Sequence, residues 1–386
     1  MAVFLDHAAT SPLRPEALAA LTAALSHLGN PSSTHSHGQA TREILEQARD
    51  KIAAAINCNR SEVIFCSGGT EANNQAIKGL WWSRKTLTRK LIISSSLEHK
   101  ALLDPIEWLV ANEGAEFLEL PIKNGEVDLL ALENILANRH SEVALISLML
   151  VNNETGVITD VGRVVELAKR YDIPVHSDAV AALGRVPMDF ASLGLTAMSI
   201  SGHKVGAPIG IGALIVRRDS KPNSLIHGGG QERGLRSGTM NYSLASSFGA
   251  ATEQAVNQMV KTQARLKQLR DQIESEVKSS IPTAVITAES AKRVDHNAHF
   301  VFPGVNNDSL LFLLDQEGIS VSAGSACQAG VLGPSHVLIG MGYSEQYAAS
   351  CLRVTLGHTT TEDDAQAFVE ALKRVYPMAL AASQSR

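Results

Sequence analysis

The sequence has few cysteines, and none of them lie in close pairs. Four occur among 386 residues, no C-x-x-C spacing is present, and the nearest cysteine to Cys327 is Cys351. Structural zinc sites and the disulfide frameworks of small secreted proteins need several closely or regularly spaced cysteines. The pattern therefore argues against a disulfide scaffold and predicts reduced thiols in a cytoplasmic protein.

The sequence also lacks a strong excess of charge and a long apolar run. Lys and Arg number 34 against 39 for Asp and Glu, a formal net charge of −5, which gives no basis for nonspecific attraction to nucleic acid or to a membrane. No apolar run reaches transmembrane length. Asp6 and His7 fall where a signal peptide needs its apolar stretch. We expect no direct nucleic-acid partner and no membrane partner.

Short apolar runs alternate with stretches of helical periodicity. Runs rich in β-branched residues lie at 62–68, 90–99, 143–153, 173–179, 197–204 and 211–218. This alternation is typical of an α/β fold with a mostly parallel sheet covered by helices. The remainder predicts a connecting helix at 251–280, strands of a smaller domain at 298–304, 318–324 and 351–357, and a closing helix at 361–376.

Several of these runs end in polar residues, which in an open α/β sheet lie at the ligand crevice. Asp178 ends one run and Lys204 another, while SGGTEANNQAI at 67–77 is a glycine turn opening a helix, whose N-terminus favours a phosphate. Each feature is common by itself. Together they suit pyridoxal phosphate, which needs a lysine for covalent attachment, a carboxylate for its pyridine nitrogen and an anion site. His99, at another strand end, is a candidate to stack on the ring.

These residues belong to a set of motifs that covers nearly the whole chain. The motifs are FLDHAATSP, GNPSSTHSHG (29–38), SGGTEANN, SLEHKA, VNNETGVI, HSDA, SGHKVGAPIGIGAL, HGGGQERGLRSGT (227–239), SAGSAC and LRVTLG. The set resembles the cysteine desulfurases of the class V aminotransferase superfamily, of the type with a long loop around the nucleophilic cysteine. The resemblance implies a fold-type I pyridoxal-phosphate-dependent transferase. Its large domain, at 13–255, would hold a mostly parallel seven-stranded sheet, and its smaller α+β domain would comprise 1–12 and 256–386.

The resemblance also implies roles for individual residues. Lys204 would bond the cofactor and move the substrate Cα proton, Asp178 would contact the pyridine nitrogen, Asn153 the phenolic oxygen, and His99 would stack on the ring and act in acid–base chemistry. The phosphate would be bound by Gly69, Thr70, Ser201 and His203, joined by Thr239 from the partner subunit of a homodimer. Arg353, together with Asn30, would clamp the substrate carboxylate, which suits the planar guanidinium.

Cys327, within SAGSACQAG (322–330), would attack the sulfur of L-cysteine, leaving alanine and a persulfide. Its small neighbours favour a segment that moves and carries the sulfur to an acceptor protein, either an iron–sulfur cluster scaffold or a tRNA-thiolating enzyme. Cys58, Cys66 and Cys351 lie in or beside apolar runs and are predicted to be packing residues.

Other functions remain open at this point. A different class V enzyme, such as an aminotransferase or a selenocysteine lyase, would use Cys327 differently, and a binding protein could have kept the fold without the catalysis. Histidines at 35–37 and 295–299 suggest metal ligands only weakly, because neither group has a convincing set of further ligands. We expect no metal.

One position departs from the family pattern. Cysteine desulfurases usually carry a glutamine three residues after the aspartate, where its amide donates to the phenolic oxygen of the cofactor. This sequence has Ala181 there. Asn153 would then be the main side-chain donor from these motifs.

Overall fold

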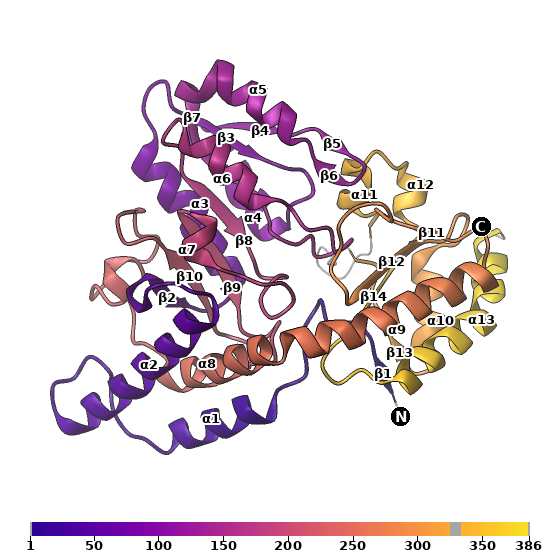
Figure 1. Cartoon of the computed structure of the whole chain (residues 1–386), viewed down its shortest axis with the longest axis horizontal. Helices are drawn as coiled ribbons and strands as arrows, with labels where there is room; N and C mark the ends of the chain where they lie inside the picture. The colour runs from indigo at the N-terminus through magenta and orange to yellow at the C-terminus, as the bar shows by residue number, and fades with distance from the viewer. Residues whose placement is uncertain (1, 325–332, 385–386) are drawn as a thin grey trace.

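A seven-stranded sheet forms the centre of the computed structural model, which describes residues 2–324 and 333–384 (Figure 1). The strand order is β2-β10-β9-β8-β7-β3-β4, and neighbours are parallel except that β10 is antiparallel to both β2 and β9. The strands are β2 (Val63–Cys66), β3 (Leu91–Ser94), β4 (Glu116–Glu119), β7 (Val143–Ser147), β8 (Val175–Asp178), β9 (Ala197–Ser201) and β10 (Gly212–Val216). The predicted fold class is confirmed.

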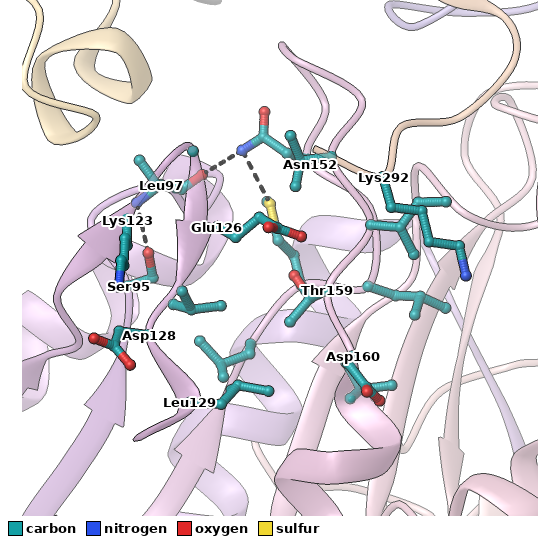
Figure 2. Close-up of a pocket in the computed structure, with 18 of the residues that line it drawn as sticks. Ser95, Leu97, Lys123, Glu126, Asp128, Leu129, Asn152, Thr159, Asp160 and Lys292 are labelled. Atoms are coloured by element: carbon teal, nitrogen blue, oxygen red, sulfur yellow. Dashed lines mark hydrogen bonds between the residues drawn. The ribbon is translucent and has the colours of Figure 1, made fainter. Parts of the chain in front are cut away.

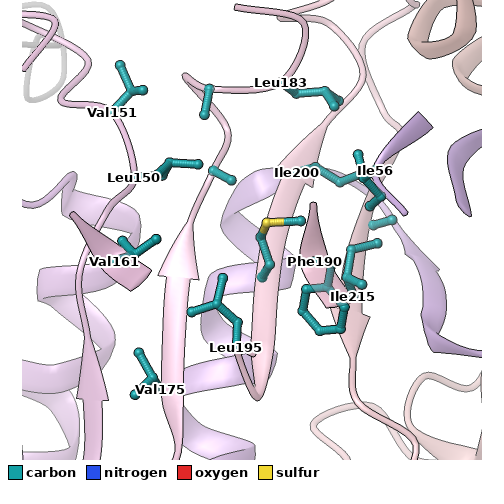
Figure 3. Packing of buried hydrophobic residues seen from close by; sticks show 14 of the residues in the cluster. Ile56, Leu150, Val151, Val161, Val175, Leu183, Phe190, Leu195, Ile200 and Ile215 are labelled. Carbon is teal, nitrogen blue, oxygen red and sulfur yellow. The ribbon is translucent and has the colours of Figure 1, made fainter. Parts of the chain in front are cut away.

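Helices cover both faces of this sheet. Successive strand residues point to opposite faces, so Val63 and Phe65 join one hydrophobic cluster while Ile64 and Cys66 join another. Burial on both faces explains why strands such as β2 and β10 are continuously apolar. One face is covered by α3 (Gly69–Arg84) and α4 (Lys100–Glu113). The other, shown in part in Figure 3, is covered by α1 (Pro15–Leu25), α2 (Ser36–Ala55), α5 (Leu129–Arg139), α6 (Val161–Lys169), α7 (Phe190–Leu193) and α8 (Tyr242–Asn257).

The C-terminal part has its own antiparallel sheet, in the order β11-β12-β14. Its strands are β11 (Val285–Ile286), β12 (Asn297–Val301) and β14 (Cys351–Thr355). Around it lie α9 (Met259–Ser280), α10 (Asn307–Gln316), α11 (His336–Gly340), α12 (Glu345–Ala348) and α13 (Glu362–Gln384). The N-terminal strand β1 (Val3–Phe4) pairs in parallel with β13 (Ile319–Ser320), which brings the start of the chain to this part.

Helices α8 and α9 run end to end between the two parts (Figure 1). Leu266 and Ile273 of α9 belong to the same hydrophobic cluster as Val3, Leu5 and Phe300. On this basis we propose that residues 13–255 form one domain, and that residues 1–12 and 256–386 form the other.

Short elements complete the chain, and several strands, among them β4 of the main sheet, were not anticipated from the sequence. β5 (Ile122–Lys123) and β6 (Glu126–Val127) form a hairpin, and 3-10 turns occupy Arg60–Glu62, His140–Glu142 and Glu232–Gly234. Strand β4 escaped prediction because it lies at the sheet edge, where its residues are exposed or half-buried and do not form an apolar run.

Candidate active site

The carboxyl ends of adjacent strands bring several predicted residues together. Asp178 is the last residue of β8, Ser201 is the last of β9, and Lys204 lies in the turn that follows β9. The two strands are parallel neighbours, so their ends share one edge of the sheet. Helices α3 and α4 begin at this edge as well, which places Gly69 and His99 there.

Lys204 is held by the N-terminal segment of the chain. Its Nζ donates hydrogen bonds to the carbonyl oxygens of Ala8 and Ala9, the latter at 2.9 Å. Burial, followed by the positive charge of Arg353, lowers the pKa of this amine to about 8. About a tenth of the amine is therefore unprotonated at pH 7, far more than for an ordinary lysine, and this is the state in which a lysine acts as a nucleophile or a base.

Asp178 is buried and fixed by two donors. Asn73 Nδ2 donates to its Oδ2 at 2.6 Å, and the N–H of Val180 donates to its Oδ1 at 2.9 Å. Sequence reasoning named Asp178 but missed Asn73, although both lie in the quoted motifs. The signal was present in the second turn of α3, where an asparagine stands among apolar residues on the buried side of the helix.

The start of α3 has the features of a phosphate site. Gly69 packs so closely on Val180 that a Cβ at position 69 would lie 2.7 Å from Val180 Cγ2. Ser201 is buried next to Gly69, and among the described residues its Oγ has no hydrogen-bond partner. Thr70 is exposed in the first turn. Burial, together with the charge of Lys204, lowers the pKa of His203 to about 4, so that its ring is neutral at pH 7.

His99 caps the first turn of α4. Its Nδ1 accepts a hydrogen bond from the N–H of Ala101 at 3.0 Å, so the proton of the neutral ring belongs on Nε2. Burial lowers the pKa of His99, while the negative charge of Asp178 opposes and the positive charge of Lys204 adds to that shift. His99 is thus a neutral donor close to both groups.

Arg353, on β14, reaches the same site from the C-terminal part and is 4% exposed. Its Nη2 pairs with Asp6 Oδ1 at 2.7 Å, and its Nη1 donates to the carbonyl of Asn153 at 2.9 Å. Within the described part of the chain, Arg353 Nε and Asn153 Oδ1 are buried without a partner. Both side chains therefore have capacity for a ligand. Sequence reasoning did not foresee Asp6 as the partner of Arg353.

The other predicted residues are not brought to this group. Asn30 is exposed and its Oδ1 accepts the N–H of Ser32 at 2.9 Å. Thr239 is exposed too, in a loop that the Arg236–Glu71 ion pair ties to the first turn of α3. Cys327 and its neighbours from 325 to 332, for which movement was predicted, lie outside the described residues.

Two buried carboxyl groups adjacent in sequence to predicted site residues were missed, those of Glu98 and Glu154. Glu98 Oε1 accepts the N–H of Met149 at 2.8 Å, while its Oε2 is buried without a partner among the described residues. Glu154 Oε2 accepts from the hydroxyl of Ser335. Burial raises the pKa of each carboxyl, well above its usual range for Glu98, where the negative charge of Asp178 adds to the effect. A glutamate within a polar motif reads from sequence as an exposed charge, which is why neither was identified.

Replacing Glu98 with glutamine is expected to give a variant whose stability advantage over the wild type grows as the pH rises. The folded protein holds the Glu98 proton more tightly than the unfolded chain does, so the protonated carboxyl adds to the free energy of unfolding of the wild type. This contribution is complete below about pH 4.5 and is lost as the pH rises toward the higher pKa of the folded state. Thermal unfolding of both proteins at pH 5 and pH 8 measures the difference. The exposed Glu107→Gln in the nearby helix α4 controls for loss of a charge, and an equal gain at both pH values would contradict the prediction.

The three described cysteines do not resemble nucleophiles. Burial raises the pKa of Cys58, Cys66 and Cys351 to about 12, so each is a protonated thiol at neutral pH. No group of three or more His, Cys, Asp or Glu residues suited to a metal occurs in residues 2–324 and 333–384. None of the helices in those ranges is long and apolar enough to cross a membrane.

Two cavities lie near the strand ends. The larger, of about 710 Å³, is lined by apolar residues such as Leu129 and by the charged residues Lys123, Asp160 and Lys292 (Figure 2). None of the predicted cofactor residues lines it. A much smaller cavity lies against Lys204 itself, and its other lining residues include Asn153, Ala181, Arg185 and His296.

The residues at the sheet edge fit pyridoxal phosphate. The unpartnered Ser201 hydroxyl and the start of α3 suit its phosphate, the anchored Asp178 carboxylate suits its ring nitrogen, and the amide of Asn153, which can donate from its Nδ2, suits a ring oxygen. The Lys204 amine, with its lowered pKa, suits the aldehyde. Fold and site together define a pyridoxal-phosphate-dependent enzyme.

Comparisons with known proteins agree. Residues 3–368 match the aminotransferase class-V family. The chain is 44% identical to an IscS-like cysteine desulfurase of Mycobacterium tuberculosis (96% of this chain, 95% of the relative) and 41% identical to cysteine desulfurase IscS of Dictyoglomus turgidum (97% and 94%). The solved structure of a NifS-like protein from Rickettsia africae matches with a TM-score of 0.88 and 30% identity, covering 98% of this chain and 100% of that one. The chain belongs to the class-V aminotransferase family, and within it to the cysteine desulfurases; its cofactor is pyridoxal phosphate.

Proposed function

We propose that this protein converts L-cysteine to L-alanine and carries the sulfur as a persulfide on Cys327. The observation that carries the proposal is the Lys204 amine, whose pKa is lowered to about 8 at the edge of the sheet where Asp178 ends its strand. Such an amine can first bond the cofactor and then, once released by the substrate, accept the Cα proton. When bound, pyridoxal phosphate supplies a ring that stores the electrons left by that proton.

Neighbouring side chains hold the reacting groups in place. Asp178, anchored by Asn73, would keep the ring nitrogen protonated, and the Nε2–H of His99 would serve as a proton donor against the ring. Arg353 would bind the substrate carboxylate through its unpartnered Nε. Arg353 carries this part of the proposal alone, because Asn30 is exposed.

Cys327 would take the sulfur as a thiolate. It attacks the substrate sulfur, so an S–S bond forms and the Cβ–S bond breaks, with its electron pair left on the carbon fragment. That fragment takes up a proton at Cβ and regains one at Cα to become alanine. The overall change, L-cysteine plus protein thiol to L-alanine plus protein persulfide, balances without an added oxidant.

Turnover of L-cysteine without a co-substrate tests the proposal. We expect alanine in equal amount to released sulfur when a thiol reductant discharges the persulfide. A requirement for an oxo acid would indicate an aminotransferase, and strong preference for L-selenocysteine would indicate a selenocysteine lyase. Absence of a visible, borohydride-sensitive cofactor band would count against catalysis of any of these kinds.

The sulfur acceptors would be proteins, either an iron–sulfur cluster scaffold or a tRNA-thiolating enzyme. We place the enzyme in the cytoplasm, because a reducing compartment keeps the Cys327 thiol available for each turnover. Incubation with labelled L-cysteine and each purified acceptor would show which one receives the label.

We further propose a homodimer whose partner subunit supplies Thr239 to the phosphate site. Two observations support this arrangement. Thr239 is exposed although its loop is tied to the start of α3 through Arg236 and Glu71. Leu18, Leu25 and nearby Leu28 are 51%, 64% and 80% exposed, an apolar surface that association of subunits would cover.

Mixing two inactive variants is expected to restore activity. In a hybrid dimer of Lys204→Ala and Thr239→Ala subunits, one site has both wild-type residues, so random exchange should recover up to about a quarter of wild-type activity. Activity after subunit exchange, monitored by native mass spectrometry, measures this recovery. Mixing Lys204→Ala with the double variant provides no intact site and is the control; no recovery after proven exchange would place Thr239 outside the shared site.

A further inference from the structure

The small cavity beside Lys204 is lined by a positively charged side chain, Arg185, which the family motifs do not explain. Its lining includes Asn153, Ala181 and Arg185. Ala181 occupies the position where related enzymes carry a glutamine, and its methyl group can donate no hydrogen bond. Arg185 lies four residues later, after a turn in which the N–H groups of Leu183 and Val186 donate to the carbonyls of Ala179 and Ala182.

Arg185 is a charge without a counter-charge. Burial and the neighbouring charge of Arg14 lower the pKa of its guanidinium to about 10, which still leaves it positive at neutral pH. Its Nη2 donates to Ser11 Oγ at 3.3 Å, and that hydroxyl donates in turn to the backbone carbonyl of Lys204 at 3.0 Å. Within the described ranges no carboxylate forms an ion pair with Arg185. A mostly buried cation in this state acts strongly on nearby charges, because little solvent screens it.

Among the described residues, no carboxylate lines this cavity with Arg185. His7 and His296 line the same cavity, and burial, together with the charge of Arg185, lowers the pKa of both, to about 3 for His7. Both rings are therefore neutral at pH 7. The other charged or titratable groups that act on Lys204 or Arg185 are Arg353, Asp6, Asp178, Arg14, His99, His203 and His358.

We propose that Arg185 is a positioning residue of the reaction, whose guanidinium replaces the amide that Ala181 lacks and supplies positive charge at the cavity that Lys204 and Asn153 also line. The inference rests on the proposed attachment of the cofactor to Lys204. A cation at this place disfavours a proton on the Lys204–cofactor linkage and favours the anionic ring oxygen. Removing the charge should therefore make the bound cofactor easier to protonate.

Titration of the visible absorbance of the bound cofactor tests this role. Arg185→Leu should raise its apparent pKa by about one unit, whereas Arg185→Lys, which keeps the charge, should stay close to the wild type. Ala181→Gln should lower the pKa by up to about one unit in the wild-type background, and should reverse most of the increase when combined with Arg185→Leu. The rate at which apoprotein binds pyridoxal phosphate covalently should shift along the pH axis in the same direction.

Each outcome decides a different point. An unchanged pKa in Arg185→Leu, with the cofactor stoichiometrically bound, overturns the role of Arg185; so does an equal shift in Arg185→Lys, which would indicate a steric effect. If Arg185→Leu does not fold, Arg185→Gln carries the same expectation. Failure of the wild-type protein to bond the cofactor at Lys204 would instead refute the proposed function. The titration uses neither L-cysteine nor Cys327, so loss of sulfur transfer cannot imitate a result.

Discussion

Replacing Lys204 with alanine is expected to abolish turnover and the borohydride-sensitive visible band together. The variant loses the covalent bond to the cofactor and the group that moves the Cα proton; loss of a general acid–base group alone costs on the order of 10²–10⁴-fold in rate. It also loses the hydrogen bonds from Nζ to Ala8 and Ala9. Alanine production from L-cysteine and the absorbance spectrum before and after borohydride measure both effects.

The exposed Lys221→Ala is the matched control, since it removes a lysine from the surface and should leave both readouts unchanged. Circular dichroism would show whether Lys204→Ala keeps its fold. A folded variant that still forms a borohydride-sensitive band would show that another residue bonds the cofactor.

Replacing Cys327 with alanine should separate cofactor binding from sulfur transfer. Because the thiol acts after substrate has bound, the variant should keep the visible band and change its spectrum when L-cysteine is added, while alanine formation falls by several orders of magnitude. The thiolate is the nucleophile, and the described thiols, Cys58, Cys66 and Cys351, each have a pKa raised to about 12 by burial. They cannot substitute for it.

Cys58→Ala, which removes a partly buried thiol elsewhere in the chain, is the control and should retain activity. Mass spectrometry after a single turnover should find the extra sulfur atom on wild-type protein and not on Cys327→Ala. Normal alanine production by Cys327→Ala would remove this cysteine from the mechanism.

Much of the fold was predictable because its signals are local. The apolar runs that contain β2 and β10 each form a strand buried on both faces, and such strands are continuously apolar whatever their neighbours. Two features were not predictable in this way. The antiparallel direction of β10 depends on how the chain returns to the sheet, and β4 lies at an edge where burial imposes no pattern.

The sequence by itself determined which residue types stand at the strand ends, and thereby the class of cofactor. Lys204, Asp178 and the turn at Gly69 could be named because each follows a strand or opens a helix, and parallel strands present their carboxyl ends at a common edge. The structure shows these residues at one edge of the sheet, as expected. The resemblance to a family added the roles.

Only the tertiary structure decided how these groups are partnered. Asn73 reaches Asp178 across 105 positions, and Asp6 reaches Arg353 across 347; contacts at such separations leave no periodic trace in the sequence. The same holds for charge. In the sequence, Glu98 and Arg185 look like ordinary surface charges. Burial by segments distant in sequence raises the pKa of Glu98 and leaves Arg185 as an unpaired cation beside Lys204. Only the tertiary structure decides this, because desolvation depends on the whole fold.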